Sequence, residues 1–370
     1  MKLAFVLFKY FPYGGLQRDM LQIARVCQQR GHEIHIYTLG WEGDRPADMH
    51  IHVLPVQRWT NHQRYRVFCE SLQPLYREHG IDRVVGFNKM PGLDFYYAAD
   101  PCLRDKLIRE RSPLVRRLPR YRHFLRYEEA VFGNDSKTRI LLISPRQHHI
   151  YRKHYATDEE RLHMLPPGID RSRMAGSDAE ELRRDLREEF GVADDEKLIL
   201  CIGSGFKTKG LDRSLKALAA LPARLREKTR LIAIGSDNGD PFVRLASRLG
   251  VGERFLVLHG RDDIPRFLQG GDLLLHPAYY ENSGMVILEA IIAGLPPLVT
   301  SVCGYAYYVE EAGAGRVVPE PFSQQTLDSM LADMLESDEA EKWRENGIRY
   351  GQTNDLYSMT THAADLILAP

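Results

Sequence analysis

The chain has 370 residues, 44% of them hydrophobic and 27% charged, with 50 Lys and Arg balancing 50 Asp and Glu. This length suits two domains of ordinary size, and the composition is that of a globular enzyme rather than a disordered or fibrous protein. No apolar run approaches the ~20 residues of a membrane-spanning helix. The five cysteines (27, 69, 102, 201, 303) form no Cys-x-x-Cys, which favours a reducing compartment and argues against a cysteine zinc site.

Charge is distributed unevenly along the chain. Residues 1–166 carry 27 Lys and Arg against 18 Asp and Glu, a balance of +9, and residues 167–370 carry 23 against 32, a balance of −9. An uneven charge distribution of this kind carries information about binding partners rather than about the fold. The first half is therefore expected to face an anionic partner.

Short apolar runs alternate with amphipathic helices, which predicts parallel sheets covered by helices. Met1–Lys9 is too short for a signal peptide and lacks a cleavage site, so it is interpreted as the first strand. Strands are predicted at 3–8, 33–38, 83–87 and 140–143, then at 198–202, 231–234, 255–258, 272–276, 297–300 and 316–318.

Segment 165–170, Leu-Pro-Pro-Gly-Ile-Asp, is the best candidate for a linker between two domains. We therefore predict an N-terminal domain at 1–166 and a C-terminal domain at 167–352, with a last helix at about 353–370 returning to the first domain. Ligands of open α/β sheets bind beyond the carboxyl ends of the strands, so two such domains facing each other would form a cleft.

The most informative motif joins the predicted strand 272–276 to a predicted helix at 284–293. Glu281 precedes that helix and Glu289 lies two turns into it. The N–H groups of Gly284, Met285 and Val286 form a helix N-terminus, which attracts phosphate. Two carboxylates beside a phosphate cradle indicate a nucleotide sugar, although Glu281 as a turn residue is the plainer alternative.

Two loops of the first domain are further candidates. Gly14-Gly15 follows the first strand, where paired glycines allow close approach of a ligand. Asp19 can contact the donor or simply favour the helix N-terminus. Asp100 ends a short apolar stretch and can contact an acceptor hydroxyl, with a turn role before Pro101 equally open.

The loop Gly203–Gly210 follows a predicted strand and carries Lys207 and Lys209. It fails the dinucleotide pattern at Thr208 and the P-loop pattern at Leu211, so both of those classes are disfavoured. What remains is a loop with two lysines, which suits a diphosphate. No Asp-x-Asp occurs, so a metal-dependent diphosphate site of that kind is not supported. We expect neither a metal nor another cofactor.

Three further residues are weaker candidates. Arg261 at a strand end and Arg173 after the linker can bracket the nucleotide, with surface arginines as the alternative. His276 ends a strand and is interpreted as a packed structural residue.

Residues 104–126 form a strongly basic segment interleaved with apolar and aromatic residues. Such segments bind anionic membrane surfaces, and nucleic acid is the rival partner. Pro113 and Pro119 exclude one continuous helix. The basic residues are Arg104, Lys106, Arg109, Arg111, Arg116, Arg117, Arg120, Arg122 and Arg126.

The unit Glu281-x7-Glu289, the Gly14-Gly15 loop and Lys209-Gly210 resemble the retaining GT-B glycosyltransferases of family GT4 over nearly the whole chain. The stretches 9–19, 85–92 and 300–305 are similar to the branch of lipopolysaccharide core glucosyltransferases. The resemblance implies an α/β GT-B fold with two Rossmann-like domains facing across a cleft. Ser204 stands where the family often has an arginine, and Lys207 is the candidate replacement.

The resemblance also implies roles and partners. Glu281 would contact the donor hexose, Glu289 the ribose and Lys209 the diphosphate, while Gly15 and the amides at 284–286 would meet phosphates or sugar. The expected partners are a UDP-hexose, a heptosylated lipopolysaccharide precursor and the anionic inner face of the bacterial inner membrane, with no nucleic acid. The alternatives left open are other UDP-sugars, a nucleotide-sugar epimerase or phosphorylase, and a non-catalytic membrane or nucleic-acid adaptor.

Overall fold

A computed structural model describes residues 1–12 and 14–369, so Tyr13, within the stretch 9–19, lies outside the described residues. The chain forms two compact units. Unit 1 contains Met1–Gly168 together with the segment from Tyr357 onward, and unit 2 contains Ile169–Leu356. The chain thus first crosses between units within the predicted linker 165–170, two residues after the predicted boundary at 166/167, and its last helix belongs to unit 1.

Unit 1 is built on a seven-stranded parallel sheet in the order β3-β2-β1-β4-β5-β6-β7. The strands are β1 (Lys2–Leu7), β2 (Glu33–Thr38), β3 (His50–Val53), β4 (Arg83–Gly86), β5 (Phe95–Ala98), β6 (Arg139–Leu142) and β7 (Leu162–Met164). The helices are α1 (Gly15–Gln29), α2 (Asn61–His79), α3 (Leu103–Glu110), α4 (Pro113–Arg116), α5 (Pro119–Phe132), α6 (Pro145–Tyr155) and α16 (Met359–Leu368), with a 3-10 turn at Glu159–Arg161.

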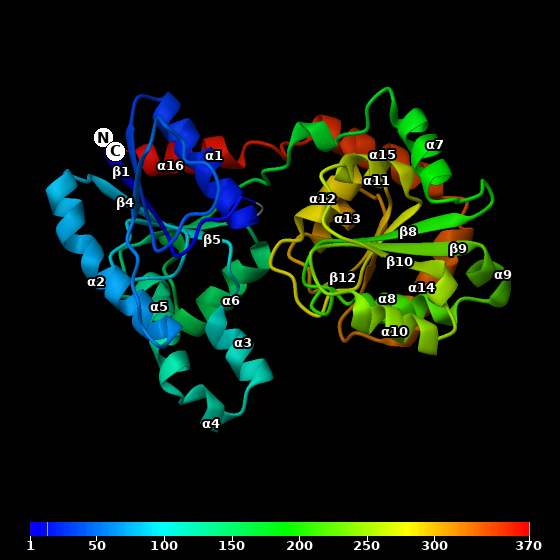
Figure 1. Ribbon diagram of the computed structural model, residues 1–370, viewed down its shortest axis with the longest axis horizontal. Coiled ribbons are helices and arrows are strands. Elements are labelled where there is room, and N and C mark those ends of the chain that lie inside the picture. Colours follow the sequence, from blue (N-terminus) through cyan, green and yellow to red (C-terminus); the bar gives the residue numbers. More distant parts are fainter. Residues whose placement is uncertain (13, 370) are drawn as a thin grey trace. The chain divides into compact units, whose positions relative to one another are not determined.

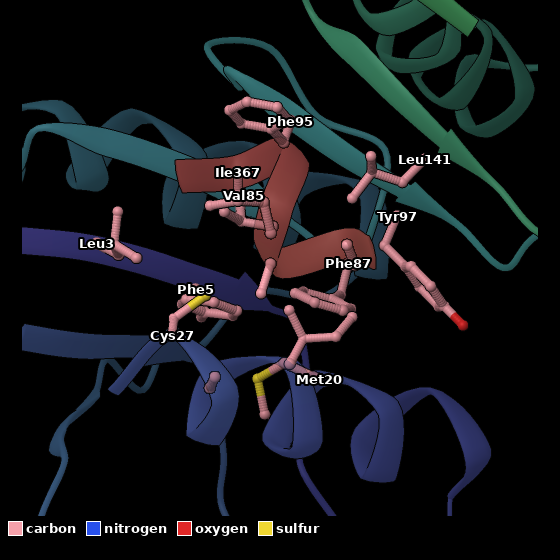
Figure 2. Packing of buried hydrophobic residues seen from close by; sticks show 14 of the residues in the cluster. Leu3, Phe5, Met20, Cys27, Val85, Phe87, Phe95, Tyr97, Leu141 and Ile367 are labelled. Atoms are coloured by element: carbon pink, nitrogen blue, oxygen red, sulfur yellow. The ribbon is translucent and has the colours of Figure 1, made fainter. Parts of the chain in front are cut away.

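Alternation along β1 builds a core on each face of this sheet, because successive side chains of a strand point to opposite faces. Leu3 and Phe5 join the cluster beneath α1 and α16, while Ala4 and Val6 join the one beneath α2, α5 and α6. Helices α1 and α16 lie side by side (Figure 1). Figure 2 shows Ile367 of α16 among the side chains of the first cluster.

Unit 2 is built on a six-stranded parallel sheet in the order β10-β9-β8-β11-β12-β13. Its strands are β8 (Lys197–Ile202), β9 (Thr229–Ile234), β10 (Phe255–Leu258), β11 (Leu273–His276), β12 (Pro297–Thr300) and β13 (Arg316–Val318). Its helices are α7 (Ala179–Glu189), α8 (Leu211–Ala220), α9 (Ala223–Glu227), α10 (Asp240–Arg248), α11 (Ile264–Gly270), α12 (Met285–Ile292), α13 (Ala306–Glu311), α14 (Gln324–Glu336) and α15 (Ala340–Thr353), with 3-10 turns at Arg171–Arg173 and Gly252–Arg254.

Helices cover both faces of this second sheet: α8, α10 and α14 lie on one side, and α11, α12 and α15 on the other (Figure 1). Strands β8 and β11 are neighbours at the centre of the sheet. Since both run in the same direction, the loops after Ile202 and His276 emerge at the same edge. Within the described residues, no helix combines the length and apolar character needed to cross a bilayer.

Candidate active site

The loops that follow β8 and β11 meet at the carboxyl edge of the unit 2 sheet. The backbone N–H of Tyr279 donates to the carbonyl of Thr208 at 2.8 Å, which ties one loop to the other. Arg213, in the first turn of α8, donates to the carbonyls of Pro277 and Ala278 at 3.1 and 3.0 Å. The turn after β11 is therefore held from the α8 side.

The other side of this turn is held by the segment that follows β12. Cys303 pairs with Glu281 in an isolated parallel bridge, and the N–H of Tyr305 donates to the carbonyl of Ser283 at 2.8 Å. The hydroxyl of Thr300 donates to the carbonyl of Ala278 at 2.9 Å. The stretch 300–305, which carried part of the resemblance, thus fixes the backbone that presents Glu281.

Lys209 and Glu281 form an ion pair at the centre of this edge. The two residues are 72 positions apart in sequence, yet Lys209 Nζ lies 2.5 Å from Glu281 Oε2. Their side chains are 23% and 19% exposed. The stem of Lys209 passes over Gly203, where a Cβ would lie only 2.9 Å from Lys209 Cε. Gly203 also has a φ of +118°, which favours glycine.

The ring of His276 contacts the same carboxylate. Its ring is 1% exposed, and its Nε2 lies 3.5 Å from Glu281 Oε2. Burial by itself would raise the pKa of Glu281, but His276 and the Lys209 ammonium outweigh it and lower this pKa to about 2. Burial lowers the pKa of His276, so the ring is neutral near pH 7. Glu281 is consequently an ionised hydrogen-bond acceptor at neutral pH and not a general acid.

Helix α12 begins where this turn ends, as the sequence predicted to within one residue at each end. Gly284 is its N-cap and has a φ of +88°, a left-handed conformation that lets the chain enter the helix. The first N–H groups of a helix have no acceptor inside it, so those of Met285 and Val286 lie at an N-terminus suited to an anion. Glu289 lies further along α12 and pairs with Arg173 at 3.7 Å.

Other residues of unit 2 predicted to bind the donor have partners of their own. Lys207 Nζ lies 2.8 Å from Asp212 and 4.9 Å from the ring centre of Tyr279, and its side chain is 71% exposed. Arg261 follows the edge strand β10 and makes a two-pronged pair with Asp263 at 2.7 and 2.8 Å. Neither is joined to the Lys209–Glu281 pair by a described contact, so their donor contacts stay predictions.

Gly15, Asp19 and Asp100 are the candidate site residues of unit 1. Gly15 is the first residue of α1. Asp19 is 6% exposed, accepts a hydrogen bond from Tyr97 at 2.9 Å and pairs with Arg18. Burial raises the pKa of Asp19. These contacts make Asp19 a link between α1 and β5, which is more than the sequence indicated. Asp100 is exposed just after β5.

The basic segment folds as the three helices α3, α4 and α5, with Pro113 and Pro119 each at a helix start, as expected. Arg104 pairs with Glu129 at 2.6 Å and lies 4.1 Å from the ring centre of Tyr155, and Arg109 pairs with Asp105 at 2.8 Å. Arg116 is half-buried, and the exposed members are Lys106, Arg109, Arg111, Arg117, Arg120, Arg122 and Arg126.

Sequence reasoning missed two parts of the site. His276 was interpreted as structural, but it also faces Glu281. Arg213 was not singled out, although its guanidinium lies 3.6 Å from the ring centres of both Tyr279 and Phe322. The available signal was position, since His276 ends β11 and Arg213 directly follows the loop after β8.

Two family models match the chain in succession. "Glycosyltransferase Family 4" matches residues 13–173, and "Glycosyl transferases group 1" matches residues 183–350. The lipopolysaccharide glucosyltransferase WaaG of Escherichia coli (strain K12) is 44% identical over 368 residues, which cover 99% of this chain and 98% of that protein. A D-inositol 3-phosphate glycosyltransferase of Nocardia farcinica is 30% identical, over 44% of this chain and 38% of its own length.

Solved structures agree with this assignment. A crystal structure of WaaG superposes with a TM-score of 0.93 at 44% identity, covering 100% of both chains. Anabaena HepE in complex with UDP and glucose gives a TM-score of 0.77 at 18% identity over 100% of both chains, and that likeness shows the fold alone. The expected GT-B fold is confirmed. The chain is similar over its full length to a lipopolysaccharide glucosyltransferase, and it belongs to the family 4 glycosyltransferases.

Proposed function

We propose that this enzyme transfers glucose from UDP-glucose to an inner-core heptose of lipopolysaccharide, with retention of the anomeric configuration. One observation carries the proposal: an ion pair of Lys209 and Glu281 beside the N-terminus of α12, at the carboxyl edge of a parallel sheet. This combination offers a cation and helix amides for a diphosphate and an ionised carboxylate for sugar hydroxyls. The lipopolysaccharide glucosyltransferase named above, similar over the full length, supports the acceptor class.

The chemistry follows from where charge develops during transfer. The bond between the sugar C1 and the UDP oxygen breaks, and a bond between C1 and the acceptor oxygen forms on the same face. The acceptor proton passes to the departing phosphate, which is the base nearest to it. Lys209 and the amides at the start of α12 stabilise the negative charge on UDP. Glu281, ionised because its pKa is about 2, accepts hydrogen bonds from the hexose.

The proposed transfer needs no metal ion. Charge on the diphosphate is offset by Lys209, with Lys207 and Arg261 as further candidates, and by helix amides. We expect the same turnover with and without excess EDTA. A loss of turnover in EDTA that Mg²⁺ or Mn²⁺ restores would contradict this part of the proposal.

A product assay tests the whole proposal. The purified chain is incubated with heptosylated lipopolysaccharide and with UDP-glucose, UDP-galactose or a UDP-N-acetylhexosamine, and products are analysed by mass spectrometry and NMR. We expect one added hexose, an α-linkage and fastest transfer from UDP-glucose. Faster transfer from another donor would identify a different donor sugar. Release of UDP without a new glycosidic bond would favour hydrolysis or epimerisation and overturn the proposal.

We further propose that the enzyme attaches reversibly to the anionic inner face of the inner membrane through α3, α4 and α5. Exposed apolar side chains lie among the exposed cations, with Ile108, Leu114 and Leu118 at 48%, 76% and 51% exposure. Each basic residue at an anionic surface contributes ~1 kcal/mol, so seven exposed ones are sufficient for attachment.

Vesicle binding separates a membrane partner from nucleic acid. Arg117 and Arg120 are both replaced by serine, and the matched control replaces the exposed Arg244 and Arg248 of α10, which removes the same charge from unit 2. We expect the first variant alone to lose binding to anionic vesicles, by about tenfold or more, with little change in turnover on a soluble acceptor. Tighter salt-dependent binding to duplex DNA than to vesicles would favour the nucleic-acid adaptor.

A further inference from the structure

Four histidines gather on one face of the unit 1 sheet, at its β2–β3 edge. The parallel register places His35 beside His50 and Tyr37 beside His52, so all of these side chains lie on one face. His79, at the end of α2, packs onto the same group, with its ring centre 4.5 Å from that of His52. The four histidines span 45 sequence positions, and the register of β2 with β3 together with the packing of α2 brings them together.

A short chain of contacts orients the central ring. Glu33 Oε1 lies 2.8 Å from His35 Nε2, and His35 Nδ1 lies 3.0 Å from His52 Nε2. His35 is 5% exposed. If Nε2 of His35 donates its proton to Glu33, Nδ1 has a free lone pair that faces the other rings. A carboxylate that holds the outer nitrogen of an imidazole is the usual support of a metal-binding histidine.

The third ring is also held in place. The hydroxyl of Tyr37 and Nδ1 of His79 are 2.7 Å apart. One ring nitrogen from each of His35, His52 and His79 lies within 4.8 Å of the others. Three imidazoles around a tetrahedral Zn²⁺ place their nitrogens roughly 3.4 Å apart, which follows from Zn–N distances of about 2.0–2.1 Å. The rings are stacked, with 7° between the planes of His35 and His52 and 22° between those of His52 and His79, so binding requires side-chain rotations that turn their nitrogens toward one ion.

The pKa values of His35 and His52 are also consistent with binding a cation. Burial, followed by the neighbouring His79, His35 and His50, lowers the pKa of His52 to about 4. Burial also lowers the pKa of His35. Both rings are therefore neutral at pH 7, as metal ligands must be.

We propose that His35, His52 and His79 bind a divalent transition-metal ion, Zn²⁺ foremost, with Glu33 as the carboxylate that orients His35. Imidazole nitrogens favour Zn²⁺ and its neighbours Ni²⁺ and Cu²⁺ over Mg²⁺ or Ca²⁺. The ion joins β2, β3 and the end of α2, so it acts as a clip on the edge of unit 1. The site is separate from the donor-binding residues of unit 2 and does not depend on the proposed transfer reaction.

The test uses the full chain without a histidine tag, stripped with a chelator and dialysed. Zn²⁺ binding is measured by calorimetry and elemental analysis, and Co²⁺ is added as a spectroscopic probe of tetrahedral coordination. We expect one ion per chain, the intense visible bands of tetrahedral Co²⁺, and a higher melting temperature with Zn²⁺ because the ion binds only the folded state. Turnover is expected to be the same with and without the ion.

Two variants test the ligand set. His52→Phe keeps a planar ring for stacking but removes both nitrogens, and His52→Gln serves if the first fails to fold by circular dichroism. The matched control is His149→Phe, at an exposed histidine on α6 of the same unit. Affinity is expected to fall at least tenfold for either His52 variant and to be unchanged for the control.

The neighbouring His50 decides between two sets of ligands, because Glu33, His35 and His50 also lie close enough to hold an ion. His50→Phe is expected to retain Zn²⁺, since His50 is 60% exposed at the outside of the cluster. Loss of the ion in this variant but not in the His52 variants would overturn the proposed set. So would a wild-type chain that binds no Zn²⁺ at micromolar concentrations.

Discussion

Replacing Lys209 with methionine removes the ammonium group and keeps a side chain of about the same length. In the structure this ammonium lies 2.5 Å from Glu281 and is largely sheltered from water. Groups that stabilise developing charge in such sites contribute about 2.7–4 kcal/mol, equivalent to roughly 10²–10³ in kcat. We therefore expect kcat for Lys209→Met to fall by about that factor, and UDP to bind more weakly.

Two other lysines calibrate this loss. Lys207 is on the same loop but is 71% exposed and paired with Asp212. Exposed pairs contribute about 0.2–1 kcal/mol, so Lys207→Met is expected to lose no more than about fivefold. Lys216, exposed on α8, is the matched control and is expected to stay within about twofold of the wild type.

The assay is initial-rate kinetics with UDP-glucose and a heptosylated acceptor, combined with calorimetric titration of UDP. The melting temperature is the control for folding, because loss of the Lys209 ammonium leaves the buried negative charge of Glu281 without its ion-pair partner and can destabilise the fold. Equal losses for Lys207→Met and Lys209→Met, or a loss below tenfold for Lys209→Met in a folded protein, would refute the assignment.

The remaining predictions concern neighbouring features. Glu281→Gln is expected to lower kcat by about 10² while UDP affinity, by calorimetry, changes less than about threefold; equal losses would contradict its role toward the sugar. The pKa of Glu281 falls from 4.5 to about 2 on folding, so the stability that its ionised form contributes is complete above pH 4.5 and is lost as the pH falls toward 2. We therefore expect the free energy of unfolding of Glu281→Gln to depend less steeply on pH in that interval than that of the wild type. Gly284 has a left-handed backbone, and a Cβ there would lie 2.8 Å from Ile287, so Gly284→Ala is expected to lower both donor affinity and melting temperature. The control is Gly250→Ala, at a left-handed glycine with open space around it, which is expected to lower only the melting temperature. Glu128 is fully buried and accepts hydrogen bonds from the N–H groups at the start of α3, so Glu128→Gln is expected to speed amide exchange at 103–111, measured by mass spectrometry, and unchanged exchange there would contradict its role.

The sheets were predictable wherever a strand is buried on both faces, because a continuous apolar run is then required. All ten predicted strands are present to within two residues at each end. Three others were missed. The strand His50–Val53 at the sheet edge alternates histidine with apolar residues, Phe95–Ala98 is only four residues long and was interpreted as an apolar stretch, and Leu162–Met164 is a three-residue edge strand.

The site was predictable in its parts but not in its contacts. Strand ends indicated that Lys209 and Glu281 belong to one edge, yet their pairing depends on β8 and β11 being neighbours, which local patterns do not specify. The partner of Arg261, by contrast, is Asp263, only two residues away in the sequence. The histidine cluster escaped notice because its members lie on β2, β3 and α2 and share no motif.

The discontinuity of unit 1 has a consequence for biosynthesis. Helix α16 packs its apolar side chains Met359, Ala363 and Ile367 into the same cluster as Met20 and Ile23 of α1, and it follows the whole of unit 2 in the chain. All of unit 2 therefore leaves the ribosome while the part of the apolar stripe of α1 that α16 covers is still exposed, although N-terminal domains usually fold first during translation. Nascent chains of this enzyme should thus be prone to chaperone capture at that stripe until the final helix emerges.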